Sequence, residues 1–358
     1  SLSFIRENAE EDAVYITLMD ALLANETAKI ETLSSFEPLE LAMINFNKSN
    51  IGNVDDLQSP LLLTLPAFNQ STKNKLIGLG LGLSSINDVS AHLASFTFSS
   101  NEKENTLETA PNLPNDKAQA LLYQVTTQKD QLQVIKAETI NLALDLATQN
   151  DIFTPVSVLY APIIKEIDIS ADLLWFAPNA FKSQLAAGEW ENAKAWYLFL
   201  RNAALSGNEI TKEWQRIRPY AVLAGFDIAE DAINQSLKQW SDLQDPSQNN
   251  TPQTNLLYAL VAALGHPIQE TLWLDLINAS SANAIEPVKP ALLINFKLAL
   301  AQEKTGQALL VLFNAVKNAD KTKQDQSFIY ECVKGLNDLS LENDARLLAV
   351  EIALNAKI

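Results

Sequence analysis

The stretch that decides the fold is Leu185–Leu200, LAAGEWENAKAWYLFL. After Gly188 it carries apolar residues at every third or fourth position, a spacing typical of one face of an amphipathic helix. These residues are Ala193, Trp196, Tyr197, Leu200 and, beyond the stretch, Ala204. Glycine is favoured directly after a helix end because it adopts the left-handed backbone conformation without steric cost. The stretch therefore predicts two helices joined by a tight turn at Gly188.

The pattern of helix, small residue and helix recurs along the chain. The turn residues are Gly188, Gly225, Gly265 and Gly306, with weaker members at Asn150 and Ser340. Their spacing is close to 38 residues, a period found in helical-repeat proteins. One hairpin of amphipathic helices cannot bury both apolar faces, whereas stacked neighbours bury each other. We therefore expect an all-α protein in which helical hairpins stack into an α-solenoid.

The unit around Gly188 resembles a tetratricopeptide repeat. Gly188 takes the place of the turn glycine, and Trp190 that of the aromatic residue two positions later. Ala193 stands where a small residue lets the helices cross, and Tyr197 is the aromatic residue four positions further on. The resemblance implies a scaffold with a concave groove that holds peptides or protein partners.

The other units are more divergent. The aromatic residue is expected two positions after the turn glycine. Asp227 stands at that position after Gly225, and Pro267 stands there after Gly265. A longer region that begins at LLYQV and ends at LENDARLLAVEIAL is similar to uncharacterised helical-repeat proteins of alphaproteobacteria. That similarity implies a bacterial origin and a helical-repeat fold, and it implies no activity.

Composition limits the classes of function. The 358 residues carry a formal net charge of −17, which repels phosphate backbones and anionic lipid and so disfavours nucleic-acid and membrane-surface binding. No apolar run approaches the roughly 20 residues that span a bilayer, so we expect no membrane insertion. One Cys and two His give no recognisable metal or catalytic arrangement, and we predict no metal, no cofactor and no enzyme activity. Cys332, His92 and His266 are each expected to have a structural role.

A polar, proline-containing segment at 99–116 suggests a division of the chain. We expect an N-terminal helical section at 1–98, a linker or long loop at 99–116, and the repeat solenoid at 117–358. Within the first section, 94–98 is a weak strand candidate. The oligomeric state is left open.

The arginines suggest a contact site, since the chain has only five and three of them lie close together in an acidic protein. A basic and aromatic patch of this kind can anchor a partner carboxylate. The alternative is that these cations pair with neighbouring Glu and Asp residues of the same chain. The candidate partner-binding residues are Arg201, Lys212, Trp214, Arg216, Arg218 and Tyr220.

Tryptophan gives a second pair of interpretations, because all six lie between Trp175 and Trp273. Trp190, Trp196 and Trp273 either fill the gaps between helices or line an aromatic groove for a peptide or glycan.

The leading functional hypothesis is a non-catalytic scaffold that binds a protein or peptide. The alternatives are the helical superhelix part of an exported cell-wall (peptidoglycan) enzyme and a self-assembling surface or structural component. The low Lys and Arg content and the near-absence of Cys favour an exported, periplasmic protein, with a cytoplasmic location as the alternative.

Overall fold

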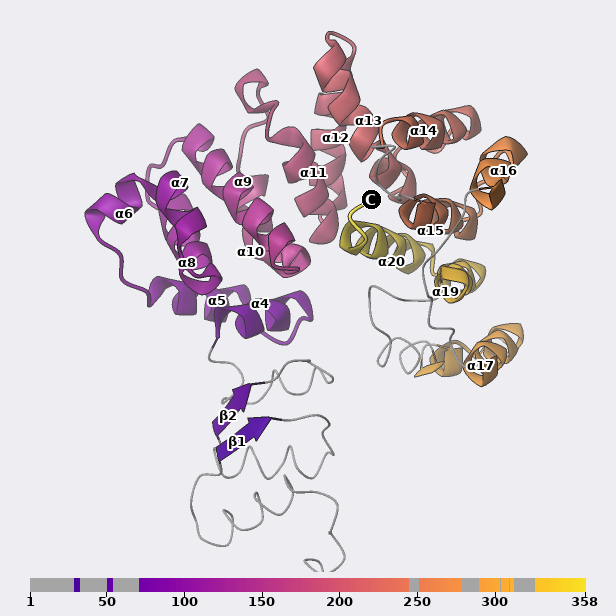
Figure 1. Cartoon of the computed structure of the whole chain (residues 1–358), viewed down its shortest axis with the longest axis horizontal. Helices are drawn as coiled ribbons and strands as arrows, with labels where there is room; N and C mark the ends of the chain where they lie inside the picture. The colour runs from indigo at the N-terminus through magenta and orange to yellow at the C-terminus, as the bar shows by residue number, and fades with distance from the viewer. Residues whose placement is uncertain are drawn as a thin grey trace, which may run out of the picture. The chain divides into compact units, whose positions relative to one another are not determined.

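A computed structural model describes residues 29–32, 50–53, 71–244, 251–278, 290–302, 304–308, 310–311 and 326–358. Apart from two short strands, the regular structure of these residues is helical (Figure 1), which confirms the all-α prediction. None of the described helices is both long and apolar enough to span a membrane. The chain divides into two compact units, Ser1–Gln124 and Val125–Ile358.

The first unit contains a short sheet that sequence reasoning missed. Strands β1 (Lys29–Thr32) and β2 (Asn50–Asn53) pair in parallel, with Ile30 opposite Ile51. Each strand has only four residues, which is too short for a period-2 pattern to stand out. The predicted strand at 94–98 is wrong, because Ala94 ends a helix and residues 95–98 form no strand.

Helices make up the rest of the described first unit. They are α4 (Thr72–Gly80), α5 (Ile86–Ala94), α6 (Ser100–Glu104), α7 (Thr106–Thr109), a 3-10 turn at Ala110–Asn112 and the main part of α8 (Asn115–Thr126). The segment predicted as a linker, 99–116, thus consists mainly of short helices, and the division between the units falls inside α8.

Ser99 and Glu102 of that segment cap a helix, and capping uses residue types that loops also favour. Ser99 accepts a hydrogen bond from the Glu102 backbone N–H, while the Ser99 N–H donates to the Glu102 carboxylate at 2.8 Å. Ser85 and Asp88 form the same reciprocal capping box at the start of α5. Each box satisfies two backbone donors that a helix N-terminus leaves without partners.

The capping boxes predict a pH dependence. Hydrogen bonds from Ser85 and Ser99 hold the pKa of Asp88 and of Glu102 below their ordinary values of 3.8 and 4.5. A lowered folded-state pKa adds stability at pH values above the unfolded-state pKa, and this stability is lost as the pH falls through the folded-state pKa. Carboxyl carbon NMR titration should give midpoints below 3.8 and 4.5. Ser85→Ala should raise only the Asp88 midpoint and Ser99→Ala only that of Glu102; midpoints that ignore these substitutions would contradict the capping role.

The second unit is built from helices that follow one another closely in sequence. They are α9 (Gln133–Gln149), α10 (Phe153–Lys165), a 3-10 turn at Ala171–Leu173, α11 (Ala177–Ala186), α12 (Trp190–Ala204), α13 (Asn208–Leu223), α14 (Glu230–Asp242), α15 (Thr251–Ala263), α16 (Glu270–Asn278), α17 (Pro290–Ala301), α19 (Gln326–Asp338) and α20 (Glu342–Asn355).

Left-handed residues mark the turns after α11, α13, α15 and α19. Gly188, Gly225 and Gly265 have φ of 75°, 79° and 87°, and Ser340 has φ of 62°. The residue after each of them donates its N–H back across the turn, as Phe226 does to the Ala221 carbonyl at 2.8 Å. This is the Schellman motif, which satisfies the last carbonyls of a helix. The turns predicted at these four residues are confirmed.

The turn predicted at Gly306 is wrong, and the turn predicted at Asn150 is present with its left-handed residue one position later. Gly306 lies inside a helical segment, and the turn comes before it, where Lys304 donates its N–H to the Ala299 carbonyl at 2.9 Å. At the first turn, Asp151 rather than Asn150 takes the left-handed conformation, with φ of 55°. Asp and Asn both tolerate this conformation, so sequence alone did not separate the two neighbours.

The turns produce helix pairs that pack side by side. The helices before the turns, α9, α11, α13 and α15, are called here the first helices, and each contacts the next in the series. The last hairpin, α19–α20, departs from this sequential order. Helix α19 packs on α15, and α20 contacts α11, α13 and α15 (Figure 1).

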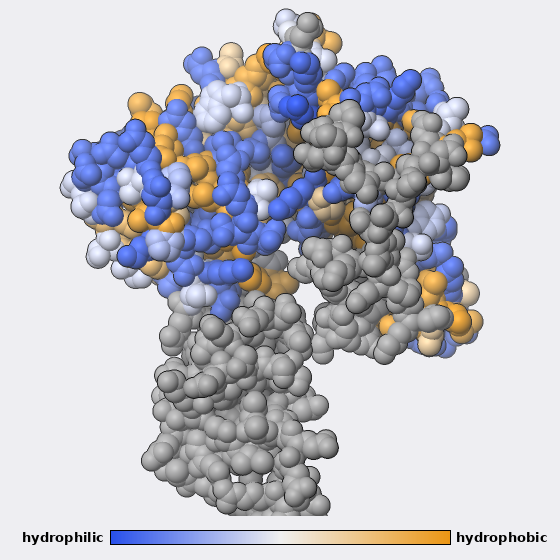
Figure 2. All heavy atoms as spheres, viewed as in Figure 1, coloured by the Kyte–Doolittle hydropathy of each residue, from blue (hydrophilic) through white to orange (hydrophobic). Residues whose placement is uncertain are grey.

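Aromatic rings fill the spaces between these helices. Trp196 is fully buried and packs edge-to-face on Phe176, with ring centroids 5.7 Å apart. Trp190 packs on Phe226 of the following turn. Trp273 packs on Tyr258 of α15. These contacts support the packing interpretation of the three tryptophans over an aromatic groove. Hydrophilic residues cover most of the described surface in the view of Figure 2.

Substitution of the turn glycines tests the left-handed turns. Gly188→Ala places a Cβ in open space, so it should cost only the left-handed strain of about 1–2 kcal/mol. Gly225→Ala should cost more, because its Cβ would also lie 3.3 Å from Nε of Arg346. Urea unfolding followed by tryptophan fluorescence reports the second unit, which holds all six Trp.

The matched control is Gly207→Ala, at an extended position with φ of −168° and open space around the new Cβ. The substitution weakens the N-cap of α13 and lowers the conformational entropy of the unfolded chain. These two effects on the free energy of unfolding should cancel to within about 0.5 kcal/mol. Equal stability of the Gly188→Ala and Gly207→Ala proteins would refute the turn assignment.

Candidate partner-binding surface

Most of the predicted contact residues lie on α13, where their spacing separates them into two lines. Lys212, Arg216 and Tyr220 follow one another at intervals of four residues, and so do Trp214 and Arg218. Residues four apart share a helix face. The two lines lie on different faces of α13, and Tyr220 is buried at the C-terminal end of its line.

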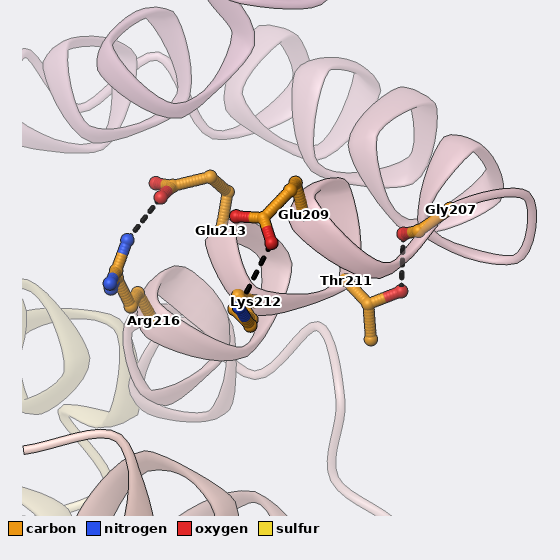
Figure 3. A network of polar contacts seen from close by, with 6 residues as sticks. All are labelled: Gly207, Glu209, Thr211, Lys212, Glu213 and Arg216. Carbon is orange, nitrogen blue, oxygen red and sulfur yellow. Dashed lines mark hydrogen bonds and ion pairs between the residues drawn. The ribbon is translucent and has the colours of Figure 1, made fainter.

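The first turns of α13 carry two ion pairs within the helix (Figure 3). Lys212 Nζ lies 2.9 Å from Glu209 Oε1, and Arg216 pairs with Glu213. All four side chains are roughly half exposed or more, and exposed pairs of this kind contribute only about 0–1 kcal/mol. An incoming carboxylate can therefore compete with Glu209 and Glu213 for these cations at little cost.

Arg218 is an interior residue. Its Nε donates to Asp227 Oδ2 at 2.8 Å, its Nη1 donates to Gln239 Oε1 at 3.2 Å, and its guanidinium lies 4.8 Å from the ring centroid of Trp214. The Arg218 side chain is only 6% exposed. These contacts tie α13 to the turn that follows it and to α14, so Arg218 has a structural role.

Two tyrosines complete this interior polar region. Tyr197 donates its hydroxyl to Asp227 Oδ2 at 3.2 Å, and burial together with the charge of Asp227 raises the Tyr197 pKa to about 12. Tyr220 is buried and donates its hydroxyl to the Ile358 carbonyl oxygen. Burial raises the pKa of Tyr220 as well.

The six predicted residues therefore do not form one surface patch. Arg218 and Tyr220 are buried against the chain itself and offer no surface to a partner. Lys212 and Arg216 are accessible on α13, Arg201 is accessible on α12, and Trp214 is half-buried. For the Arg216 and Arg218 side chains, the alternative of pairing with Glu and Asp of the same chain describes the observed contacts.

The first helices carry a second set of polar residues that sequence reasoning missed. We call it the polar row and define it as Asn141, Asp145, Asn179, Lys182 and Glu213. Asn179 Nδ2 donates to Asn141 Oδ1 at 2.8 Å and to Asp145 Oδ1 at 3.1 Å, which joins α11 to α9. Within α9, Asn141 Nδ2 donates to Asp145 Oδ2 at 3.1 Å. The signal in the sequence was the interval, because Asn141 and Asn179 are 38 residues apart.

Lys182 is the electrostatic centre of the polar row. Burial lowers the Lys182 pKa, against the opposing influence of the Asp145 and Glu213 charges. Burial also raises the pKa of Asp145, against the Asn179 hydrogen bond and the Lys182 charge. Among the described residues, Lys182 makes no hydrogen bond and no ion pair within 4 Å. A partly buried cation without a direct partner is suited to receive an external anionic group.

The histidines and the cysteine have the structural positions expected for them. His92 Nε2 lies 3.0 Å from Thr72 Oγ1, which links α5 to α4. His266 follows Gly265 in the turn after α15, and burial lowers its pKa. Cys332 is buried in α19, and burial raises its thiol pKa. Within the described residues, no three His, Cys, Asp or Glu side chains are grouped as metal ligands would be.

Compared with known proteins, the chain matches no family model, no curated protein and no solved structure.

Arginine substitutions on α13 should separate the two lines of residues. Arg218→Ala leaves the Asp227 carboxylate largely buried without its cation, so we expect a loss of about 3–5 kcal/mol in the free energy of unfolding. Arg216→Ala removes a half-exposed pair and should cost less than about 1 kcal/mol. Urea unfolding followed by tryptophan fluorescence measures both. Equal losses in the free energy of unfolding for the two variants would contradict the interior position of Arg218.

Proposed function

We propose that this chain is a non-catalytic helical-repeat scaffold, a solenoid of helix hairpins that binds a polypeptide partner along the surface of its first helices. The observation that carries the proposal is the polar row. Its side chains come from α9, α11 and α13, and they interact from one hairpin to the next. A surface shared by successive hairpins suits an extended ligand better than a compact one.

The repeat interpretation is supported by equivalent positions that meet in space. Asn141 and Asn179 are 38 residues apart and share a hydrogen bond, as expected for corresponding residues of adjacent hairpins. The left-handed turn residues Asp151, Gly188 and Gly225 recur at a similar interval. The resemblance to tetratricopeptide repeats and to alphaproteobacterial proteins remains part of this proposal, as does the exported, periplasmic location.

The ligand chemistry follows from the charges of the surface. Among the described residues, Lys182 has no hydrogen-bond or ion-pair partner within 4 Å, and Arg216 pairs with Glu213 of its own helix. We therefore infer that the partner segment carries at least one carboxylate, placed to meet Lys182 or to replace Glu213 at Arg216. Because the polar row contains both a cation and carboxylates, the rest of the partner segment should carry hydrogen-bond donors or cations as well as acceptors or anions.

Peptide selection on the immobilised full chain, followed by fluorescence anisotropy of the selected peptides, tests this function. Lys182→Ala should weaken binding at least about tenfold, which corresponds to about 1.4 kcal/mol. Arg216→Ala should weaken it in the same direction.

The matched control is Lys194→Ala, which removes the same charge from an exposed position on α12. Its affinity should match that of the unsubstituted protein. Peptides that bind all of these proteins equally, or a selection that yields no peptide, would refute the proposed surface.

A further inference from the structure

One carboxylate of the polar row, Glu213 on α13, interacts with cations that come from two helices. On α13 itself, Glu213 pairs with Arg216, as Figure 3 shows. Helix α11 contacts α13, and its Lys182 feels the Glu213 charge, which opposes the lowering of the Lys182 pKa by burial. Glu213 therefore borders both of the cations that the proposed function assigns to a partner carboxylate.

The Glu213 side chain satisfies only one of these two cations. It is in direct contact with Arg216, whereas no carboxylate among the described residues lies within 4 Å of Lys182 Nζ. Glu213 is attached to α13 three residues before Arg216, which limits where its carboxylate can lie. A carboxylate on a separate polypeptide segment has no such restriction, so it can be placed to contact both cations with charge-assisted hydrogen bonds.

The contact between Glu213 and Arg216 can be broken at little cost. The Glu213 and Arg216 side chains are 46% and 53% exposed, and ion pairs that are this accessible to water contribute little to stability. Among the described residues, the Glu213 carboxylate makes no hydrogen bond other than the one with Arg216. An incoming ligand can therefore displace the Glu213 side chain while α13 keeps its fold.

The neighbouring ion pair on α13 has the same local geometry and no cation from another helix. Glu209 pairs with Lys212, also three residues away, and their side chains are 85% and 50% exposed. The cations whose charges act on Glu209 are Lys212 and Arg216, which both belong to α13. Of these two carboxylates, Glu213 is the one that also borders Lys182 of α11.

We propose that Glu213 is an internal stand-in for the carboxylate of the partner segment. In the free protein Glu213 occupies Arg216, and the partner's carboxylate displaces it and contacts Arg216 and Lys182 together. The displaced Glu213 stays on α13, where its negative charge repels the carboxylate that has replaced it. This inference rests on the proposed function, and it identifies Glu213 as the residue that limits the affinity of that surface for acidic segments.

The probe is a labelled peptide that was selected on the immobilised full chain and that loses affinity for the Lys182→Ala protein. Glu213→Gln keeps the size of the side chain and removes its charge. By fluorescence anisotropy, the peptide should bind the Glu213→Gln chain at least about fivefold more tightly than the unsubstituted chain, because no internal carboxylate competes for Arg216 or repels the ligand. Equal or weaker binding would overturn the inference.

The matched control is Glu209→Gln, which makes the same change of charge one turn earlier on α13. Its affinity for the peptide should match that of the unsubstituted chain. An equal gain for Glu209→Gln and Glu213→Gln would overturn the inference, since net charge alone would then explain both. A second peptide, in which amides replace the acidic side chains, should show no gain with Glu213→Gln; a gain that persists without carboxylates would also overturn it.

A measurement without ligand tests the same arrangement. Glu213→Gln removes a negative charge beside Lys182, so the NMR titration midpoint of the Lys182 side chain should fall further below its ordinary value, while Glu209→Gln should leave it unchanged. A Lys182 midpoint that ignores Glu213→Gln would overturn the inference. Peptides that depend on Lys182 but bind the Glu213→Gln and unsubstituted chains equally would overturn it too and leave the proposed function in place, so failure of the two proposals can be distinguished.

Discussion

The second unit depends on how a helix can end. A residue in the left-handed conformation lets the chain reverse within a few residues while the last carbonyls of the helix keep hydrogen-bond partners. Gly188, Gly225, Gly265 and Ser340 supply this conformation, and Asp151 supplies it at the first hairpin. Because each reversal is short, the two helices of a hairpin must pack on each other, and apolar and aromatic side chains such as Trp196 fill the space between them.

The last hairpin contacts several of these reversals. Lys357 pairs with Asp151, Arg346 lies against Gly225, and Asn337 lies beside Gly265. A cation near the carbonyl end of a helix is electrostatically favourable. The Arg346 side chain, which comes from α20, lies near that end of α13. The first helices carry the polar row, in which Lys182 lies among the charges of Asp145 and Glu213. The last hairpin thus links turns that lie far apart in the sequence, and this tertiary arrangement is the basis of the account of the second unit.

Much of the second unit could be predicted from sequence, because helical periodicity and turn glycines are local signals. The helices around Gly188 and Gly225 are examples. Gly306 was misplaced because a glycine also occurs within helices, and the linker at 99–116 was misjudged because Ser99 and Glu102 cap a helix with the residues that loops favour. The candidate site was less predictable. Clustering in sequence could not show that Arg216 and Arg218 point to different surroundings, and no local pattern predicted that α20 would return to α11, α13 and α15.

The most direct test of this account is nuclear Overhauser contact between the last helix and the turn after α13. In the full chain, the Gly225 α-protons should show cross-peaks to the Arg346 side chain, and the Tyr220 ring protons should show cross-peaks to the Ile358 methyl groups. These contacts are possible only if the hairpin reverses at Gly225 and α20 lies across it. Absence of both sets of cross-peaks, with the helices otherwise formed, would contradict the arrangement on which the account rests.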